Sequence, residues 1–382
     1  MPPPPTPRPP VMVAVFNQKG GVAKTTTSCN LAVCLRAFGY HVLLVDLDTQ
    51  GNATGSFGFT PLPATGSFEV ITGRAKAADI ALDTPYPGLW LLPATTSLRD
   101  DTHMLAHAGR RRGLLEARLA DTGVDVVIVD CPPALAAATA TALASASVVL
   151  LPVRPDPFAH EGLVNTWYEI KRFRETINGR LGVAGILMTM SGSEPAGDDV
   201  ARVIRAEFGD HVYATEIATD PKVAEAAGMA LPVAVLDPDG PAGRAYVDAT
   251  RELLFRLARH ERPDLLLPEP LAVETALNQL REWRATTHAA LLRVPGRGDG
   301  WAGTGADGHE DADTVPDDYF GPVPATDPSP PPPRPGLGRM AAALLAGLLA
   351  GMAIEAGTGI LSGILGRSAG DAAVRYTGPN PP

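Results

Sequence analysis

The strongest constraint on the fold is a series of short apolar runs that alternate with longer helix-like stretches between residues 11 and 262. Most of these runs are continuous Val, Ile and Leu, which is typical of parallel strands buried on both faces. The alternation predicts a parallel sheet covered by helices. We expect strands at residues 11–16, 41–46, 89–92, 125–130, 148–153, 185–188 and 212–216.

The stretches between these runs predict the helical layers. We expect helices at residues 25–38, 114–120, 139–145, 162–177, 198–208 and 243–259. The fold class is therefore α/β, a doubly wound and mostly parallel sheet with helices on both faces. Hydrophobic residues make up 45% of the chain and charged residues 19%, so a wholly disordered chain is excluded.

The length of 382 residues exceeds the usual range of one domain and predicts further segments. We divide the chain into a Pro-rich arm (1–10), the α/β domain (11–262), an additional helix (263–294), a disordered acidic Pro/Gly-rich linker (295–338), an apolar Gly/Ala/Leu segment (339–367) and a disordered tail (368–382). The apolar residues of the additional helix are Leu277, Leu280, Trp283, Leu291 and Leu292.

The apolar segment begins with fifteen residues, 340–354, that carry no charge, and Glu355 follows them. Fifteen residues are too few for a bilayer span, and a glutamate in mid-membrane is costly. Three interpretations of residues 340–365 stay open at this point. The segment contacts a membrane, forms a helix buried in a partner, or is an unstructured tail.

Cysteine usage and charge limit the cellular setting. Cys29, Cys34 and Cys131 form no metal-type pair and are odd in number, which favours a reducing cytoplasm. We find no pattern of a secretory signal and expect a cytoplasmic protein. The net charge of −10 excludes a bulk polycation, so any DNA contact needs a local basic patch.

The most informative segment is residues 11–31, in which an apolar run is followed by a Gly-containing loop and then by Lys24 and Thr25 at the start of a helix. Backbone N–H groups in such a loop converge on phosphate oxygens, and the helix N-terminus adds a favourable dipole. We expect Lys24 to contact the β and γ phosphates and the Thr25 hydroxyl to complete a Mg²⁺ shell. The standard motif would place glycines at Gln18 and Ala23, so this loop departs from it.

The loop Lys19-Gly20-Gly21-x-x-Lys24-Thr25-Thr26 instead resembles the deviant Walker A motif of the ParA/MinD family of ATPases. The resemblance implies a P-loop NTPase fold and a nucleotide contacted by Gly20, Gly21, Val22, Ala23, Lys24, Thr25 and Thr26. It also implies that Lys19 reaches across a nucleotide-sandwiched dimer to the partner's phosphates, like an arginine finger supplied in trans. Ala23 stands where glycine is commoner in the family, which matters only if the backbone needs a positive φ, and we expect the change to be tolerated.

Two further segments resemble motifs of the same family. Residues 42–54 look like its second motif, in which Asp46 lies near the magnesium waters and Asp48 positions or deprotonates the attacking water. Residues 124–133 look like a Walker B strand whose Asp130 holds Mg²⁺ through water. The expected catalytic residues are thus Lys19, Lys24 and Asp48, and the expected metal site comprises Thr25, Asp46 and Asp130.

The resemblance extends over residues 11–260 and includes the expected base pocket. By analogy with the family, Asp220 and Pro221 border the adenine. The family usually carries Arg-Asn where this chain has Thr219 and Asp220.

The resemblance implies a Mg²⁺-dependent ATPase that forms a homodimer on ATP and binds DNA nonspecifically to partition plasmid, chromosome or other cargo. A ParB-like partner would stimulate hydrolysis. The DNA-binding candidates are Lys171, Arg172, Arg202, Arg205, Arg251 and Arg256, for which solvated helix faces are the alternative. A MinD-like ATPase that associates with membrane through the apolar segment is the alternative function. A scaffold with a vestigial P-loop would have lost one of Lys19, Lys24, Thr25, Asp48 or Asp130, all of which are present.

Overall fold

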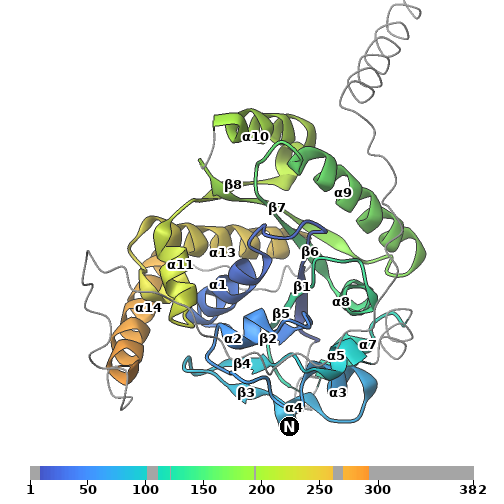
Figure 1. The fold of residues 1–382 in the computed structure, drawn as a ribbon, viewed down its shortest axis with the longest axis vertical. Coiled ribbons are helices and arrows are strands. Elements are labelled where there is room, and N and C mark those ends of the chain that lie inside the picture. Colours follow the sequence, from blue (N-terminus) through green and yellow to red (C-terminus); the bar gives the residue numbers. More distant parts are fainter. Residues whose placement is uncertain (1–8, 101–110, 121, 193–194, 261–269, 292–382) are drawn as a thin grey trace, which may run out of the picture. The chain divides into compact units, whose positions relative to one another are not determined.

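The computed structural model describes residues 9–100, 111–120, 122–192, 195–260 and 270–291 (Figure 1). Within them an eight-stranded sheet has the order β3-β4-β2-β5-β1-β6-β7-β8. Every neighbouring pair is parallel except β3 and β4, which are antiparallel. The doubly wound, mostly parallel sheet is confirmed. The predicted linker, apolar segment and tail, and residues 1–8 of the arm, lie outside the described residues.

The strands are β1 (Val11–Val15), β2 (Val42–Asp46), β3 (Leu82–Asp83), β4 (Leu89–Leu92), β5 (Val126–Asp130), β6 (Val148–Val153), β7 (Gly182–Ser191) and β8 (Val212–Ala218). All seven predicted strands are present. β1 lies between β5 and β6, and the chain proceeds to β2 and β4 on one side and to β6, β7 and β8 on the other. The strand order therefore reverses beside β1, at the carboxyl ends of the strands where doubly wound sheets bind ligands.

Helices cover both faces of the sheet (Figure 1). The helices packed on one face are α1 (Lys24–Ala37), α2 (Asn52–Gly55), α11 (Pro221–Gly228), α12 (Val233–Leu236), α13 (Pro241–His260) and α14 (Pro270–Leu291). The other face carries α3 (Ser67–Thr72), α4 (Ala77–Ile80), α5 (Ser97–Asp100), α7 (Leu114–Leu119), α8 (Ala137–Ser145), α9 (Ala159–Thr176) and α10 (Pro195–Phe208), and the 3₁₀ helix η1 (Gly209–His211) precedes β8. Side chains of β1 alternate between the two cores, as the two-residue period of a strand requires.

The structure differs from the sequence-based expectation in its short elements. β3 and the helices α2, α3, α4, α5, α11 and α12 were not predicted, since elements of two to eight residues show little periodicity. β7 extends from Gly182 to Ser191 rather than over residues 185–188, and its pairing with β6 shifts register between Val149 and Leu150. A glycine with φ of +142°, Gly185, lies at this irregularity, where an added Cβ would meet the Tyr213 ring.

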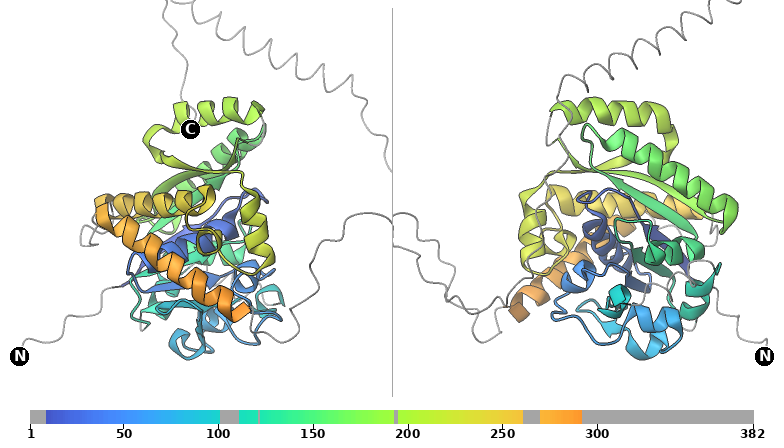
Figure 2. Two further views of the ribbon diagram at one scale, coloured as in Figure 1. Left: turned by 90° about the vertical axis from the view of Figure 1, so that its left-hand side faces the viewer. Right: turned by 45° about the vertical axis from the view of Figure 1, so that its right-hand side comes forward.

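The additional helix predicted within residues 263–294 is present as α14, which packs against α1, α12 and α13 (Figure 2). Its buried residues are Ala276, Leu277, Leu280 and Trp283. The predicted apolar residues Leu291 and Leu292 lie outside the side chains that the structure describes. Among the described helices, none is long and apolar enough to cross a membrane.

Candidate nucleotide-binding site

The loop between β1 and α1 has a backbone that opens toward solvent. Gly20 and Gly21 are exposed, and a Cβ added at either would meet no atom within 4 Å. Gly21 has a φ of 70°, and Ala23, the residue before α1, has a φ of 59°. Ala23 therefore adopts a positive φ. Glycine, the commoner residue at this position in the family, would adopt it without steric cost.

Polar contacts anchor this loop from two neighbouring strands. The buried Asn17 donates from Nδ2 to the Pro152 carbonyl at 2.9 Å and accepts from the Lys19 N–H at 3.0 Å. The Thr189 hydroxyl on β7 donates to the Val22 carbonyl at 3.2 Å. Sequence reasoning missed Asn17, although a polar residue directly after a buried strand is a signal that could have identified it.

Lys24 lies inside the loop with only 7% of its surface exposed. Its ammonium donates to the Lys19 carbonyl at 2.7 Å. Burial lowers the pKa of Lys24, while the carboxylates of Asp130 and Asp48 oppose that effect. The ammonium is thus held within the curve of the loop, where an anionic phosphate would compensate its burial.

Asp130 ends β5 and is fully buried next to α1. Its two oxygens accept from the Thr25 hydroxyl at 2.8 Å and from the Ser28 hydroxyl at 2.7 Å. Burial, reinforced by the negative charge of Asp46, raises the pKa of Asp130 to about 7. The structure therefore brings together Thr25 and Asp130, two of the residues expected at the metal, and adds Ser28 as a residue that sequence reasoning missed.

Asp46 ends β2 and lies opposite Asp130 in the register of the two strands. One of its oxygens accepts from the N–H and the hydroxyl of Thr54, at 2.8 and 2.7 Å, and the other accepts from the Asp48 N–H at 3.1 Å. Burial raises the pKa of Asp46 to about 6 despite these hydrogen bonds. Because both oxygens bind protein groups, Asp46 fixes the segment from Asp48 to Thr54 in this structure.

Asp48 is 9% exposed and forms a turn in which its Oδ1 accepts from the Gln50 N–H at 3.0 Å. Its carboxylate acts on Lys24 electrostatically, so it lies on the phosphate-loop side of the sheet edge.

Lys19, the other expected catalytic lysine, forms an ion pair with Asp156, which follows β6. Burial would raise the pKa of Asp156, but the hydrogen bond and charge of Lys19 lower it. Asp156 is 137 positions from Lys19, so spacing gave no signal for this pair.

The expected base-pocket residues lie at the start of α11. Asp220 is the N-cap residue and accepts from the Lys222 N–H at 2.9 Å, and Pro221 is the first residue of the helix. The other oxygen of Asp220 accepts from the Ala242 N–H at 3.2 Å. The pair thus joins the carboxyl end of β8 to the start of α13, at the same edge of the sheet as the loop after β1.

The donor set fits Mg²⁺ bound with phosphate and water. Within the described part of the chain, no group of three or more His, Cys, Asp or Glu residues could hold a metal by itself. Thr25 and Asp130 instead offer one hydroxyl and one carboxylate next to the loop. Mg²⁺ usually keeps several waters and uses one or two carboxylates together with substrate phosphates, which matches this sparse set.

The basic residues proposed for DNA divide between the two faces of the sheet. Lys171 and Arg172 on α9 and Arg202 on α10 are exposed, and Arg172 and Arg202 form ion pairs with Glu169 and Asp199. Arg205 on α10 pairs with Glu216 and donates to the Tyr213 carbonyl. These four residues share one side of the molecule.

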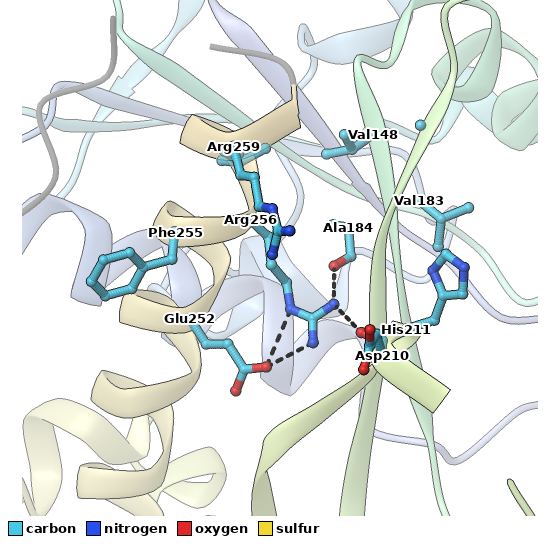
Figure 3. Close-up of a pocket in the computed structure, with 11 residues that line it drawn as sticks. Val148, Val183, Ala184, Asp210, His211, Glu252, Phe255, Arg256 and Arg259 are labelled. Carbon is cyan, nitrogen blue, oxygen red and sulfur yellow. Dashed lines mark hydrogen bonds and ion pairs between the residues drawn. The ribbon is translucent and has the colours of Figure 1, made fainter. Parts of the chain in front are cut away.

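Arg251 and Arg256 lie on α13, on the opposite face. All five guanidinium N–H groups of Arg256 are engaged, by the Glu252 carboxylate and the carbonyls of Ala184, Asp210 and Val212. Figure 3 shows this side chain in a pocket of about 680 Å³ at the amino ends of β6 and β7. Arg256 therefore ties α13 to the sheet, and the structure does not place it with the residues of α9 and α10.

The fold and the site define a P-loop nucleotide-binding protein. A family model described as an AAA domain matches residues 11–183. The chromosome partitioning protein ParA of Caulobacter vibrioides is 37% identical over 251 residues, which cover 64% of this chain and 94% of that protein. The chromosome-partitioning ATPase Soj of Thermus thermophilus is 39% identical over 246 residues, covering 64% and 96%. The chain belongs to the ParA/MinD family of ATPases.

Solved structures agree with this fold. Apo McdA from Cyanothece matches with a TM-score of 0.57 and 20% identity over 64% of this chain and 99% of that one, which supports the fold. A cobyrinic acid a,c-diamide synthase from Mycobacterium smegmatis with bound ADP and magnesium matches with a TM-score of 0.55 and 29% identity, over 68% and 99%.

Proposed function

We propose that this protein is an ATP-dependent partition ATPase of the ParA type, which dimerises on ATP, binds DNA nonspecifically and positions plasmid, chromosome or other cargo in the cytoplasm. The observation that carries the proposal is the two-lysine loop. Lys24 is buried within it, whereas the side chain of Lys19 is 31% exposed and is held at the rim by Asp156. The ParA and Soj relatives, which match over nearly their full lengths, support the same role.

Each residue of the site has a separate role in the proposed hydrolysis of ATP. Bound Mg²⁺ would neutralise charge on the β and γ phosphates of ATP. Lys24 and the loop N–H groups would bind the phosphates, and Thr25 and Asp130 would hold the metal. Asp48 orients the attacking water, and Lys19 of one copy stabilises the transferring phosphoryl group bound to the other. Asp46 keeps Asp48 in place through its hydrogen bonds, and Asp220 and Pro221 border the base.

For DNA contact we propose the exposed Lys171, Arg172 and Arg202 of α9 and α10, together with Arg205 of α10, which is partly buried and paired with Glu216. Arg251 contributes less, because its guanidinium stacks on the Phe255 ring at 5.3 Å on the other face. Arg256 does not contact DNA in this proposal, because its guanidinium N–H groups donate to Glu252 and to backbone carbonyls of the protein itself. A ParB-like partner that stimulates hydrolysis remains part of the proposal on the strength of the family.

The proposal is tested by retention of DNA with and without ATP at several salt concentrations. The wild-type protein should retain DNA only with ATP, and Lys19→Ala should still bind ATP but no longer retain DNA when ATP is present. Lys76→Ala is the matched control, because Lys76 is an exposed lysine before α4 and far from the loop. DNA binding that is independent of ATP and unaffected by Lys19→Ala would refute the mechanism.

Hydrolysis is tested separately with Asp48→Ala. This variant should bind ATP with wild-type affinity and hydrolyse it at least roughly tenfold more slowly, because the water is no longer oriented. Wild-type turnover in Asp48→Ala would remove Asp48 from its role and leave the DNA proposal standing. The MinD-like alternative depends on residues 340–365, which lie outside the described residues, and it stays a prediction.

A further inference from the structure

Helix α14 lies on the sheet face that also carries the phosphate-loop helix α1 (Figure 2). Its buried positions, Ala276, Leu277, Leu280 and Trp283, follow each other at one-, three- and three-residue steps and form a single apolar stripe. The helix is beyond residues 11–260, whose motifs carry the family resemblance. Its contact with the ATPase domain is therefore a feature of this chain to be explained from its own residues.

Trp283 begins a line of three buried aromatic rings. Its centroid is 5.1 Å from that of Tyr86, in the loop before β4, and Tyr86 meets Phe57 edge-on at 6.1 Å. Trp283 and Phe57 are each 7% exposed and Tyr86 is 1% exposed. Aromatic pairs at these separations attract one another, and a packed interior transmits displacement of one ring to the next.

The line ends at the segment that carries Asp48. The Phe57 N–H donates to the Thr54 carbonyl at 3.3 Å. Thr54 in turn binds Asp46 through its N–H and hydroxyl, and Asp46 accepts from the Asp48 N–H. Each step from Phe57 to Asp48 is a hydrogen bond, so the Phe57 ring helps to set the position of the turn that presents the Asp48 carboxylate.

A second contact fixes α14 without Trp283. Arg281 binds both oxygens of Asp239 at 2.6 and 3.0 Å, in the turn before α13, and it also binds Glu274 at 2.9 Å. Helix α13, which follows the turn that holds Asp239, supplies the Ala242 N–H that binds Asp220. The helix is thus anchored at its polar face, and Trp283 projects from a defined backbone into the aromatic line.

We propose that Trp283 is a positioning residue for ATP hydrolysis, which acts through Tyr86 and Phe57 to hold the segment from Asp48 to Phe57 against the phosphate loop. The proposal rests on ATP hydrolysis at the site described above and does not depend on DNA binding. The loop itself is anchored to β6 through Asn17 and to β7 through Thr189. Loss of the Trp283 ring should therefore affect turnover more than nucleotide affinity.

The experiment compares Trp283→Ala and Trp283→Phe with the matched control Trp167→Ala in the full chain. Trp167 on α9 packs on the rings of Phe208 and His211, at 5.2 and 4.9 Å, on the opposite face of the sheet. We expect Trp283→Ala to lower kcat roughly tenfold while the Kd for ATP stays within about twofold, and Trp283→Phe to restore most of the rate. Trp167→Ala should keep its kcat within about twofold of wild type.

Amide hydrogen exchange of residues 48–57 in the nucleotide-free protein is the second measurement. Trp283→Ala should exchange these amides faster than wild type, and Trp167→Ala should not. Wild-type exchange at residues 48–57 in Trp283→Ala, or an equal loss of kcat in Trp167→Ala, would overturn the proposal. If Trp283→Ala does not fold, Trp283→Leu takes its place with the same criteria. An inactive wild-type protein would contradict the proposed function, and the exchange comparison would then still show whether Trp283 orders residues 48–57.

Discussion

A single substitution at Ala23 should increase the stability of the folded protein. It has φ of 59° and ψ of 33°, in the left-handed region, and its carbonyl accepts the Thr27 N–H at 2.8 Å at the start of α1. The Cβ of an L-residue is crowded in this conformation, at a cost of roughly 1–2 kcal/mol. Replacement by glycine removes the Cβ and leaves the hydrogen bonds of the loop intact.

The expected gain is smaller than the strain, because glycine also increases the entropy of the unfolded chain. That opposing effect is about 0.4–1 kcal/mol. The net result for Ala23→Gly is an increase of about 0.5–1 kcal/mol in the free energy of unfolding. For a domain of this size, that corresponds to a Tm higher by about 1–4 °C.

Thermal and urea denaturation of the nucleotide-free protein measure this gain, with two glycine substitutions as references. Ala230 follows α11 with φ of 55°, so Ala230→Gly should be stabilised for the same reason. Ala120, the exposed C-cap residue of α7, has φ of −62°, so Ala120→Gly relieves no strain and should lose about 0.4–1 kcal/mol through the entropy of the unfolded chain. If Ala23→Gly loses as much stability as Ala120→Gly, the backbone argument is refuted.

Three other perturbations test the charged contacts. Arg256→Ala should lower the free energy of unfolding by about 3 kcal/mol, because Glu252 loses its ion-pair partner and three backbone carbonyls lose a donor. Arg202→Ala, at an exposed residue, should change it by less than about 0.5 kcal/mol in the same urea titration. Asp130 has a pKa of about 7 in the folded chain against 3.8 ordinarily, so the native state binds the extra proton and stability falls as pH rises from about 4 to 7. Asp130→Asn should flatten that decline by on the order of 2 kcal/mol in Mg²⁺-free protein, and a curve parallel to wild type would contradict the shift. Asp156→Asn should free Lys19 and lower the Kd of the proposed ATP-dependent dimer about twofold to fivefold in sedimentation experiments, and a weaker dimer would contradict a competing ion pair.

The buried strands and the phosphate loop could be predicted because their signals are local. Val42–Asp46 and Val126–Asp130 are continuous apolar runs that end in a carboxylate, and parallel pairing then places Asp46 beside Asp130. The hydroxyl after Lys24 is likewise fixed by its place at the start of α1. Sequence order and strand direction are sufficient to predict that these groups meet at one edge of the sheet.

The rest depends on contacts between distant parts of the chain. Asp156 pairs with Lys19 although the two are 137 positions apart in the sequence. Trp283 contacts Tyr86 from a helix whose apolar face could be predicted from the sequence, whereas the surface on which that helix packs could not. The role of Arg256 was unpredictable for the same reason, since three of its acceptors are backbone carbonyls. Charge on a helix predicts a cation at the surface, and only the tertiary structure shows whether the protein itself uses that cation.

The ion pairs of α9 and α10 give a physical reason why DNA binding by the proposed dimer would depend on ATP. Arg172, Arg202 and Arg205 are each paired with a carboxylate of the same chain, and the whole chain carries a net charge of −10. One copy therefore presents few uncompensated cations to DNA. Each phosphate neutralised makes the slope of log K against log salt more negative by about 0.9, and joining two weak sites can raise the overall affinity by about 10²–10⁴. In the proposed mechanism, ATP would increase DNA affinity by joining two weakly basic surfaces, with no rearrangement of either one.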